Sequence, residues 1–288
     1  MTGGTKKYGR VYVEITNLCN MNCSFCHGTK REARSLDLSE FARICSNLKG
    51  LTEYLYFHVM GEPLTHPLLP IFIEYAARCG YKVALTTNGK LLSRRADELI
   101  ATRPYKINIS LHSFEGRKKD EQRAYVDSCL DFAKSASEKG ILVVLRLWNL
   151  EDGTENDTIS ELNSTVREAI SAKFGDPESV SARGVRIRDK LHLEFAERFG
   201  WPDAQGEDLG ASVFCHGLKD HFGILSDGSV VPCCLDADGE MTLGNIFSSD
   251  VRDILSGERA CAIRDGFMKK TAAEEMCRRC PYARRFKI

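Results

Sequence analysis

Short runs rich in β-branched and aromatic residues alternate with helical segments along this 288-residue chain. Strands are expected at Val11–Thr16, Tyr54–Val59, Lys82–Thr87, Lys106–Leu111 and Ile141–Leu147. Helices are expected at Ser39–Leu48, Leu68–Cys79, Ser93–Thr102 and Asp120–Lys139, and a polar helix at Asn156–Ala172. This alternation predicts an α/β fold with a parallel sheet and helices outside it, either open or closed into a barrel. In such sheets, ligands bind at the carboxyl ends of the strands.

Three cysteines directly after the first expected strand indicate an iron–sulfur site. Cys19, Cys23 and Cys26 form a C-x3-C-x2-C spacing on a polar loop. Three thiolates can bind three irons of a 4Fe–4S cluster, which takes four ligands when complete. The remaining iron would be open, as is typical of metal sites that carry out chemistry. The alternatives are buried packing thiols or a zinc knuckle, which needs a fourth ligand such as His27.

Composition restricts the partners and the compartment. Lys plus Arg and Asp plus Glu both number 40, so the chain lacks the charge expected of a nucleic-acid or anionic-membrane binder. No apolar run approaches the ~20 residues of a membrane helix, and the N-terminus has no apolar signal region. We therefore expect a cytoplasmic protein without nucleic-acid or membrane partners. In such a chain, 12 cysteines indicate metal sites rather than disulfides.

The cysteine motif, with the apolar Phe25 before its last cysteine, resembles the signature of the radical S-adenosylmethionine (SAM) enzymes. The resemblance implies a partial (βα)6 TIM-like barrel over residues 11–205, after a tail at residues 1–10. It also implies that the amino and carboxylate groups of SAM chelate the open iron. In that family the reduced cluster cleaves SAM to methionine and a 5′-deoxyadenosyl radical, which abstracts a hydrogen atom from the substrate.

The segment after the second expected strand, HVMGEPL, resembles the G-G-E-P motif that binds the SAM amino group in many family members. Gly61 and Glu62 fit this motif, and Met60 takes the place of its first glycine. His58, at the start of the segment, could face a pocket or be an ordinary core histidine. The resemblance therefore assigns Gly61 and Glu62 to SAM binding.

Later strand ends carry further resemblances. Thr86–Gly89 (TTNG) matches a family segment near SAM, and Ser110 matches a serine that helps hold the SAM carboxylate or ribose. His112 replaces a common aspartate and could touch substrate or be satisfied by its neighbours. Arg146, at the end of the fifth expected strand, could pair with the SAM carboxylate or form an ordinary ion pair.

A second set of cysteines occupies the C-terminal third. Cys215 and Cys233 flank FGILSDGSVVP, in which two apolar runs around Asp-Gly predict a β-hairpin that brings the two thiols together. Cys277 and Cys280 add a C-x2-C pair. Four thiolates can close a 4Fe–4S cluster completely, although a structural zinc site with four cysteines is also consistent with the spacing.

This second pattern resembles the twitch domain, the shortened form of the SPASM domain, which holds an auxiliary 4Fe–4S cluster. The resemblance places a small β-hairpin-plus-helix domain at residues 206–288. It favours Cys233 over Cys234 as ligand, because Cys233 lies five residues after Gly228 in the G-x4-C spacing. No cysteine follows Cys280, so a second auxiliary cluster is not expected.

Together these features predict a radical SAM oxidoreductase with one SAM-binding cluster and one auxiliary cluster. The expected partners are a peptide or small-molecule substrate and an external one-electron donor such as flavodoxin or ferredoxin, and the expected state is a monomer. Few residues precede the first strand, so no N-terminal peptide-recognition domain is expected in this chain. The rivals are a non-catalytic electron carrier and a zinc-containing protein. No catalytic base is assigned.

Overall fold

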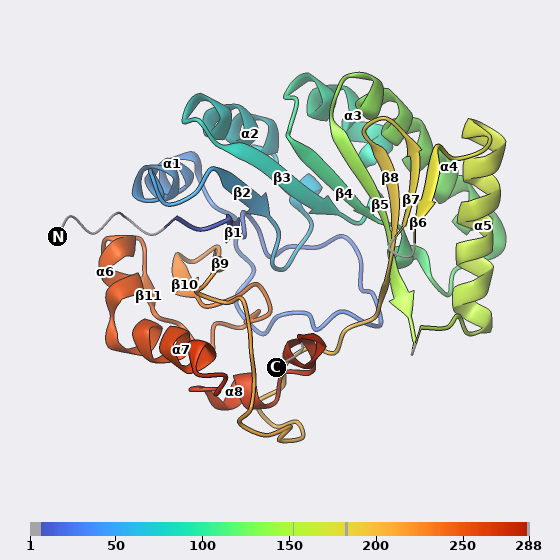
Figure 1. Ribbon diagram of the computed structural model, residues 1–288. Coiled ribbons are helices and arrows are strands. Elements are labelled where there is room, and N and C mark those ends of the chain that lie inside the picture. The colour runs from blue at the N-terminus through green and yellow to red at the C-terminus, as the bar shows by residue number, and fades with distance from the viewer. Residues whose placement is uncertain (1–6, 152, 182–183, 287–288) are drawn as a thin grey trace. The chain divides into compact units, whose positions relative to one another are not determined.

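The computed structural model describes residues 7–151, 153–181 and 184–286 (Figure 1). The chain divides into two compact units, which are described separately. Unit 1 contains the described residues up to Lys82 and those from Phe199 onward, and unit 2 contains Val83–Arg198. The first six residues of the expected tail lie outside the described residues. The domain limits expected from the sequence, 11–205 and 206–288, stay predictions.

Unit 1 contains strands from both ends of the chain: β1 (Arg10–Val13), β2 (Tyr54–Phe57), β9 (His221–Ile224), β10 (Ser229–Val231) and β11 (Gly244–Asn245). They lie in the order β11-β10-β9-β1-β2. β1 pairs in parallel with β2 on one side and with β9 on the other, with Val11 opposite Phe222. β9 and β10 form the expected antiparallel hairpin. The C-terminal hairpin therefore extends the sheet that the N-terminal strand begins.

Helices α1 (Leu38–Asn47) and α2 (Leu69–Arg78) pack together beside β1 and β2. α1 begins at a capping box, in which the Asp37 side chain accepts from the Glu40 amide and the Glu40 side chain accepts from the Asp37 amide. Its Phe41 ring stacks on Phe72 of α2 with centroids 4.3 Å apart and meets Phe57 of β2 edge-on. These rings are fully buried and form the core under this face of the sheet.

Shorter elements complete unit 1. The 3₁₀ turn η1 (Pro63–Thr65) follows β2. After the hairpin come α6 (Val251–Ser256), α7 (Glu258–Met268), α8 (Glu275–Arg278) and the 3₁₀ turn η3 (Pro281–Arg285). The hairpin followed by helices agrees with the prediction for this part of the chain.

Unit 2 holds a sheet in the order β3-β4-β5-β8-β7-β6. Parallel pairing links β3 (Lys82–Thr87), β4 (Lys106–Ser110), β5 (Leu142–Leu150) and β8 (Leu191–Glu197). β7 (Gly184–Arg188) and β6 (Ser179–Ser181) continue it in antiparallel fashion. Helices α3 (Leu92–Ala101), α4 (Lys119–Glu138) and α5 (Asp157–Phe174) cover one face, and the 3₁₀ turn η2 (Leu111–Phe114) follows β4 (Figure 1).

The α/β class with a parallel sheet is confirmed, and each expected strand and helix of the alternating region is present within a few residues of its predicted ends. Two features were not predicted. β6, β7 and β8 lie in a segment without clear periodicity, and the parallel pairing of β9 with β1 joins segments about two hundred residues apart. None of the helices in the described part of the chain is both long enough and apolar enough to cross a membrane.

Candidate functional site

The loop that carries Cys19, Cys23 and Cys26 is closed at its base by backbone and side-chain hydrogen bonds. Thr16 and Ser35 form an isolated antiparallel bridge, and their hydroxyls lie 2.8 Å apart. Asn17, which is almost buried, accepts from the Arg34 amide at 2.7 Å and donates to the Glu32 carbonyl at 2.7 Å. The asparagine side chain therefore fixes the two ends of a long loop that has no regular structure of its own. We call residues 17–34 the triad loop.

The three thiols of the triad loop are accessible. Cys19 and Cys26 are exposed and Cys23 is half-buried. The Cys26 amide donates to the Cys23 carbonyl at 3.1 Å, and the Gly28 amide lies 3.4 Å from the Cys26 sulfur. Backbone amides directed at a sulfur stabilise its thiolate and tune a bound cluster. The donor set and its accessibility fit a 4Fe–4S cluster that also binds a small molecule.

Aromatic and acidic side chains support the triad loop from within unit 1. The indole of Trp201 donates to the Phe25 carbonyl at 3.2 Å and lies over the His27 ring, with centroids 5.6 Å apart. His27 Nε2 is 3.2 Å from an oxygen of Asp238. Burial opposes ionisation of Asp238, yet hydrogen bonds from the Lys30 amide, Thr29 and His27 lower the pKa of its carboxyl. His27 is thus engaged with Asp238.

The loop after β2 approaches the triad loop closely. Gly61 has φ +77°, and a Cβ there would lie 2.3 Å from the carbonyl oxygen of Thr16. The Glu62 amide donates to the Leu18 carbonyl at 2.8 Å, and the buried Glu62 side chain accepts from the Leu64 amide at 2.9 Å. Only glycine combines this backbone conformation with this contact. The G-E-P segment therefore lies against the backbone of the triad loop.

Met60 occupies the position of the first glycine of the family motif without a positive φ. Its side chain is buried in an apolar cluster with Val59, Leu225, Val231 and Ala237. The extra side chain therefore packs against residues of the C-terminal hairpin and the segment that follows it.

In unit 2, the strand ends bring Ser110 and Arg146 together. Ser110 of β4 lies directly opposite Arg146 of β5 in the parallel register. The Arg146 guanidinium is largely buried, lies 4.2 Å from the Trp148 ring centroid, and has its Nε 3.4 Å from a carboxylate oxygen of Glu194. Both residues predicted to contact SAM in this unit thus share one edge and one face of the sheet.

His112 follows Ser110 and is almost completely buried. Its Nδ1 lies 3.1 Å from the Arg146 carbonyl oxygen and 3.3 Å from the Trp148 backbone nitrogen. Burial lowers the pKa of His112 to about 4, and the charges of Arg146 and Arg198 act in the same direction. The imidazole is therefore neutral at physiological pH, and its Nδ1 lies against the backbone of β5.

The four cysteines of the second set gather in unit 1. Burial raises the pKa of each of these thiols. Neighbouring thiols raise the pKa further: Cys234, Cys215 and Cys277 act on Cys233, and Cys215 and Cys280 act on Cys277. Cysteine ligands bind metal as thiolates, so loading must displace protons from these thiols. The four cysteines are half-buried and none is exposed, which suits a cluster whose irons are all ligated by protein.

Cys234 also contacts residues outside the second cysteine set. Its thiol is hydrogen-bonded to the Tyr12 hydroxyl, and it packs against the apolar cluster around Met60. Burial raises the pKa of Cys234 to about 11. This placement supports the choice of Cys233 over Cys234 as the ligand, which stays a prediction.

The arginines of the C-terminal tail fasten the segment that precedes Cys215. Arg284 donates to the Ser212 carbonyl at 2.5 Å and to the Gly210 carbonyl at 2.7 Å, while Arg279 donates to the Gly206 carbonyl at 2.7 Å. The charge of Arg284 also lowers the pKa of Cys280, although burial dominates and raises it. The tail thus holds the segment that leads into Cys215.

Within residues 7–151, 153–181 and 184–286, no group of three or more His, Cys, Asp or Glu side chains is placed to hold a single metal ion. A 4Fe–4S cluster takes each thiolate on a different iron, so its ligands are spread more widely than those of one ion. Both cysteine sets supply the thiols that such a cluster requires.

Comparison with known families identifies the fold and the cofactors. The sequence model of the radical SAM superfamily matches residues 13–168, more than half of the chain. The chain belongs to the radical SAM superfamily. The model of the SPASM iron–sulfur cluster-binding domain matches residues 215–281. These matches confirm the predicted cofactors: SAM, a SAM-binding 4Fe–4S cluster and auxiliary iron–sulfur chemistry in the C-terminal part.

Named relatives are similar over different extents. A GTP 3′,8-cyclase from Chlorobaculum tepidum is 31% identical over 40% of this chain, and the match spans only 37% of that protein. A probable GTP 3′,8-cyclase from Methanocella arvoryzae is 23% identical over 93% of this chain and 95% of its own length. The match to an S-adenosylmethionine-dependent nucleotide dehydratase from Selenomonas ruminantium is 33% identical over 29% of this chain and 31% of that protein.

Solved structures share the fold at low identity. BtrN in an open conformation has a TM-score of 0.57 at 16% identity, over 96% of this chain and 92% of its own. Streptococcus suis SuiB bound to the precursor peptide SuiA has a TM-score of 0.60 at 16% identity, over 96% of this chain and 71% of its own. The partial barrel with a C-terminal cluster domain, predicted from the cysteine motifs, is therefore confirmed as the fold.

Several residues of the site escaped the sequence analysis. Glu14 and Arg31 form a buried ion pair, and Trp201 and Tyr12 contact the triad loop and Cys234. A glutamate in the otherwise apolar strand before the triad was the one available signal, because a buried carboxylate needs a partner. Arg31, Trp201 and Tyr12 carry no comparable pattern.

The contact between Gly61 and the triad loop predicts the effect of a methyl group at this position. We expect Gly61→Ala to destabilise the protein more than Gly80→Ala, a control with φ +89° and no atom near the added Cβ. Both variants incur ~1–2 kcal/mol of backbone strain. The clash with Thr16 adds ~1–3 kcal/mol in Gly61→Ala alone. Anaerobic melting curves of the two variants measure the difference, and equal melting temperatures would contradict the contact.

The burial of His112 predicts a dependence of stability on pH. Its folded pKa of about 4 lies below the unfolded value of 6.5, so the unfolded chain binds an extra proton as the pH falls through this window. Between pH 7.5 and 5.5 this should cost about 1 kcal/mol of stability. We therefore expect the melting temperature of wild type to fall more over this range than that of His112→Gln. Parallel curves for the two proteins would show that His112 titrates normally.

Proposed function

We propose that this protein is a radical SAM oxidoreductase that removes a hydrogen atom from its substrate and passes the remaining electron to an auxiliary 4Fe–4S cluster. The net result would be oxidation or C–H functionalisation. The observation that carries the proposal is the presence of two distinct cysteine sets in unit 1, a set of three with two exposed members and a set of four that are all half-buried. A non-catalytic carrier would need both clusters fully ligated, whereas the first set has three cysteines.

The accessible set would hold the catalytic cluster. We assign Cys19, Cys23 and Cys26 as its ligands, with Phe25 and the Gly61–Glu62 segment beside bound SAM. When bound, the reduced cluster supplies reductive cleavage of SAM to methionine and a 5′-deoxyadenosyl radical. The backbone of the Gly61–Glu62 segment, held against the triad loop, supports its assignment to the SAM amino group.

We assign Ser110 and Arg146 to the carboxylate or ribose of SAM. Their juxtaposition at the ends of β4 and β5 supports a joint role. Arg146 also faces Glu194 at 3.4 Å, so binding SAM would have to compete with, or add to, this ion pair.

The half-buried set, Cys215, Cys233, Cys277 and Cys280, would hold the auxiliary cluster. Four thiolates leave no iron of this cluster for substrate, which favours electron transfer over substrate ligation. All four cysteines are half-buried rather than exposed, which limits the access of a substrate to this cluster.

The substrate class has two candidates. A peptide is supported by the fold shared with SuiB, whose structure contains a bound precursor peptide. A nucleotide is supported by the full-length similarity to a probable GTP 3′,8-cyclase.

Anaerobic reconstitution tests the proposal. We expect about eight irons per chain, two clusters of four, and release of 5′-deoxyadenosine when the reduced protein meets SAM. The double variant Cys277→Ala/Cys280→Ala should retain about four irons and still cleave SAM. It should fail to complete substrate oxidation, because the acceptor of the second electron is missing.

Triple replacement of Cys19, Cys23 and Cys26 by alanine is the matched control, since it should abolish SAM cleavage and keep the auxiliary cluster. Incorporation of zinc without SAM cleavage in wild type would overturn the proposal. Product analysis with GTP and with a candidate precursor peptide separates the two substrate classes. Reduced flavodoxin and ferredoxin can be compared in the same assay as electron donors.

A further inference from the structure

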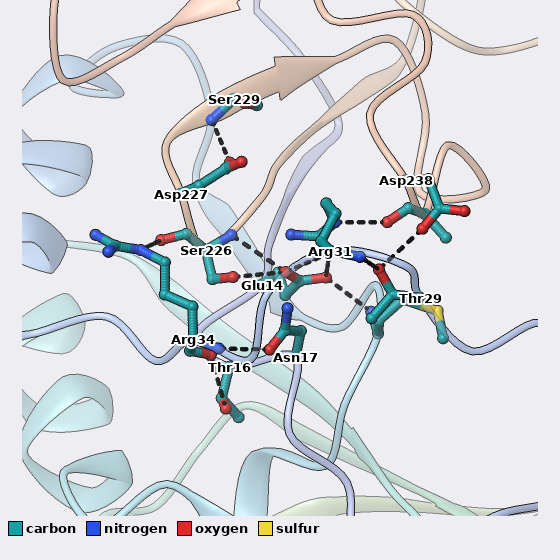
Figure 2. A network of polar contacts seen from close by, with 12 residues as sticks. Glu14, Thr16, Asn17, Thr29, Arg31, Arg34, Ser226, Asp227, Ser229 and Asp238 are labelled. Carbon is teal, nitrogen blue, oxygen red and sulfur yellow. Dashed lines mark hydrogen bonds and ion pairs between the residues drawn. The ribbon is translucent and has the colours of Figure 1, made fainter.

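One carboxylate at the end of β1 is buried among hydrogen-bond donors (Figure 2). The Glu14 side chain is fully shielded from solvent, and both of its oxygens lie 2.7 Å from Nη2 of Arg31. One oxygen also accepts from the Ser226 hydroxyl at 2.9 Å and the Ser226 amide at 3.2 Å. The other accepts from the Met60 amide at 3.2 Å. All of these partners donate, so the site is built for an ionised carboxylate.

These contacts join three segments that are distant in sequence. Arg31 belongs to the triad loop, and Met60 precedes the Gly61–Glu62 segment. Ser226 begins the turn between β9 and β10, in the part of the chain matched by the cluster-binding domain. A single side chain thus connects both proposed SAM-binding segments to the auxiliary domain.

Further hydrogen bonds connect the triad loop to the segment after Cys234. Arg31 Nε donates to the Ala237 carbonyl at 2.8 Å. Asp238 accepts from the Thr29 hydroxyl and the Lys30 amide, each at 2.9 Å. On the other side of Glu14, Arg34 donates from Nε to the Ser226 carbonyl at 2.7 Å. The triad loop is therefore linked to the hairpin turn and to the segment that follows the cysteines of the hairpin.

A gain in stability does not by itself account for the buried Glu14–Arg31 ion pair. A buried ion pair is often replaceable by apolar residues at little cost, because desolvation offsets much of the attraction between the charges. What a buried pair does provide is a single geometry, since each charge must face its partner. The contacts of Glu14 point to that use, because they fix three loops rather than one packed core.

We propose that Glu14 and Arg31 are positioning residues that couple SAM binding at the triad loop to the auxiliary-cluster domain. Ordering of the triad loop and of the Met60–Glu62 segment by SAM is transmitted through the Glu14 carboxylate to Ser226, and through Arg31 to Ala237. This inference rests on the proposed assignment of the first cysteine set and the Gly61–Glu62 segment to SAM.

Hydrogen exchange of the cluster-loaded protein, with and without SAM, tests the coupling. In wild type, SAM is expected to slow exchange in peptides covering residues 17–34 and also in peptides covering 225–239. In Glu14→Gln, an amide group must face one of the donors, so the connection is broken. Slowed exchange at 225–239 should disappear, and the dissociation constant for SAM should rise about 10- to 100-fold.

Asp127→Asn is the matched control, because it neutralises one partner of the exposed Arg123–Asp127 pair in α4. It should behave as wild type in both measurements. Glu14→Gln/Arg31→Met removes the uncompensated cation and should recover melting temperature without restoring the effect at 225–239. Ser226→Ala deletes only the hydroxyl contact and should weaken the slowing of exchange at 225–239. This variant replaces Glu14→Gln in the test if Glu14→Gln does not fold.

The outcomes separate the inference from the proposed function. If wild type binds SAM and slows exchange at 17–34 but not at 225–239, or if Glu14→Gln retains the response at 225–239, the coupling is wrong while the proposed function stands. If Glu14→Gln/Arg31→Met regains both the melting temperature and the slowed exchange at 225–239 on SAM binding, the ion pair has only a structural role. If wild type shows no response to SAM anywhere and releases no 5′-deoxyadenosine, the proposed function itself fails.

Discussion

The parallel pairing of β9 with β1 is the interaction on which the organisation of unit 1 depends. It places Phe222 opposite Val11 and Ile224 opposite Val13, so that both strands contribute to one buried face. Because β1 and β9 are parallel, the triad loop that follows β1 and the Ser226 turn that follows β9 lie at the same edge of the sheet. Cys215 precedes β9 and Cys233 follows the antiparallel β10, so these two cysteines lie at the opposite end of the hairpin from the Ser226 turn.

Close backbone contacts and buried charge then fix the loops at this edge. The conformation of Gly61 lets one loop lie directly on the first residues of the triad loop. Glu14 takes the amide of Met60 while the Met60 side chain packs into the apolar cluster. The hydrogen bond of the Met60 amide and the packing of the Met60 side chain therefore hold this residue in the same position. Such consistency is what gives an irregular loop a defined structure.

Much of this was predictable, because the signals are local. The alternating strands and helices, the Asp-Gly hairpin and the cysteine spacings depend on neighbouring residues. The G-E-P motif predicts SAM binding at Gly61 and Glu62, whereas the close approach of Gly61 to the Thr16 carbonyl is a contact between loops that the motif does not show. The register of β9 on β1 and the Glu14–Arg31 pair are likewise long-range, and no periodicity encodes them. β6–β8 were missed because their segment mixes Gly, Pro and Ser with charged residues.

The two cysteine sets differ in burial, and this difference bears on the division of labour between the proposed clusters. SAM must reach the first cluster, and two of its three thiols are exposed. Only an electron need reach the second, whose four cysteines are all half-buried, and the arginines of the tail fasten the segment that precedes Cys215. Partial burial limits the access of water and substrate to a cluster and tunes its potential. Cys234 lies near this set as well, and its hydrogen bond to Tyr12 is consistent with the predicted use of Cys233 as the ligand. The burial of each thiol therefore supports an open cluster for chemistry and a closed one for electron transfer.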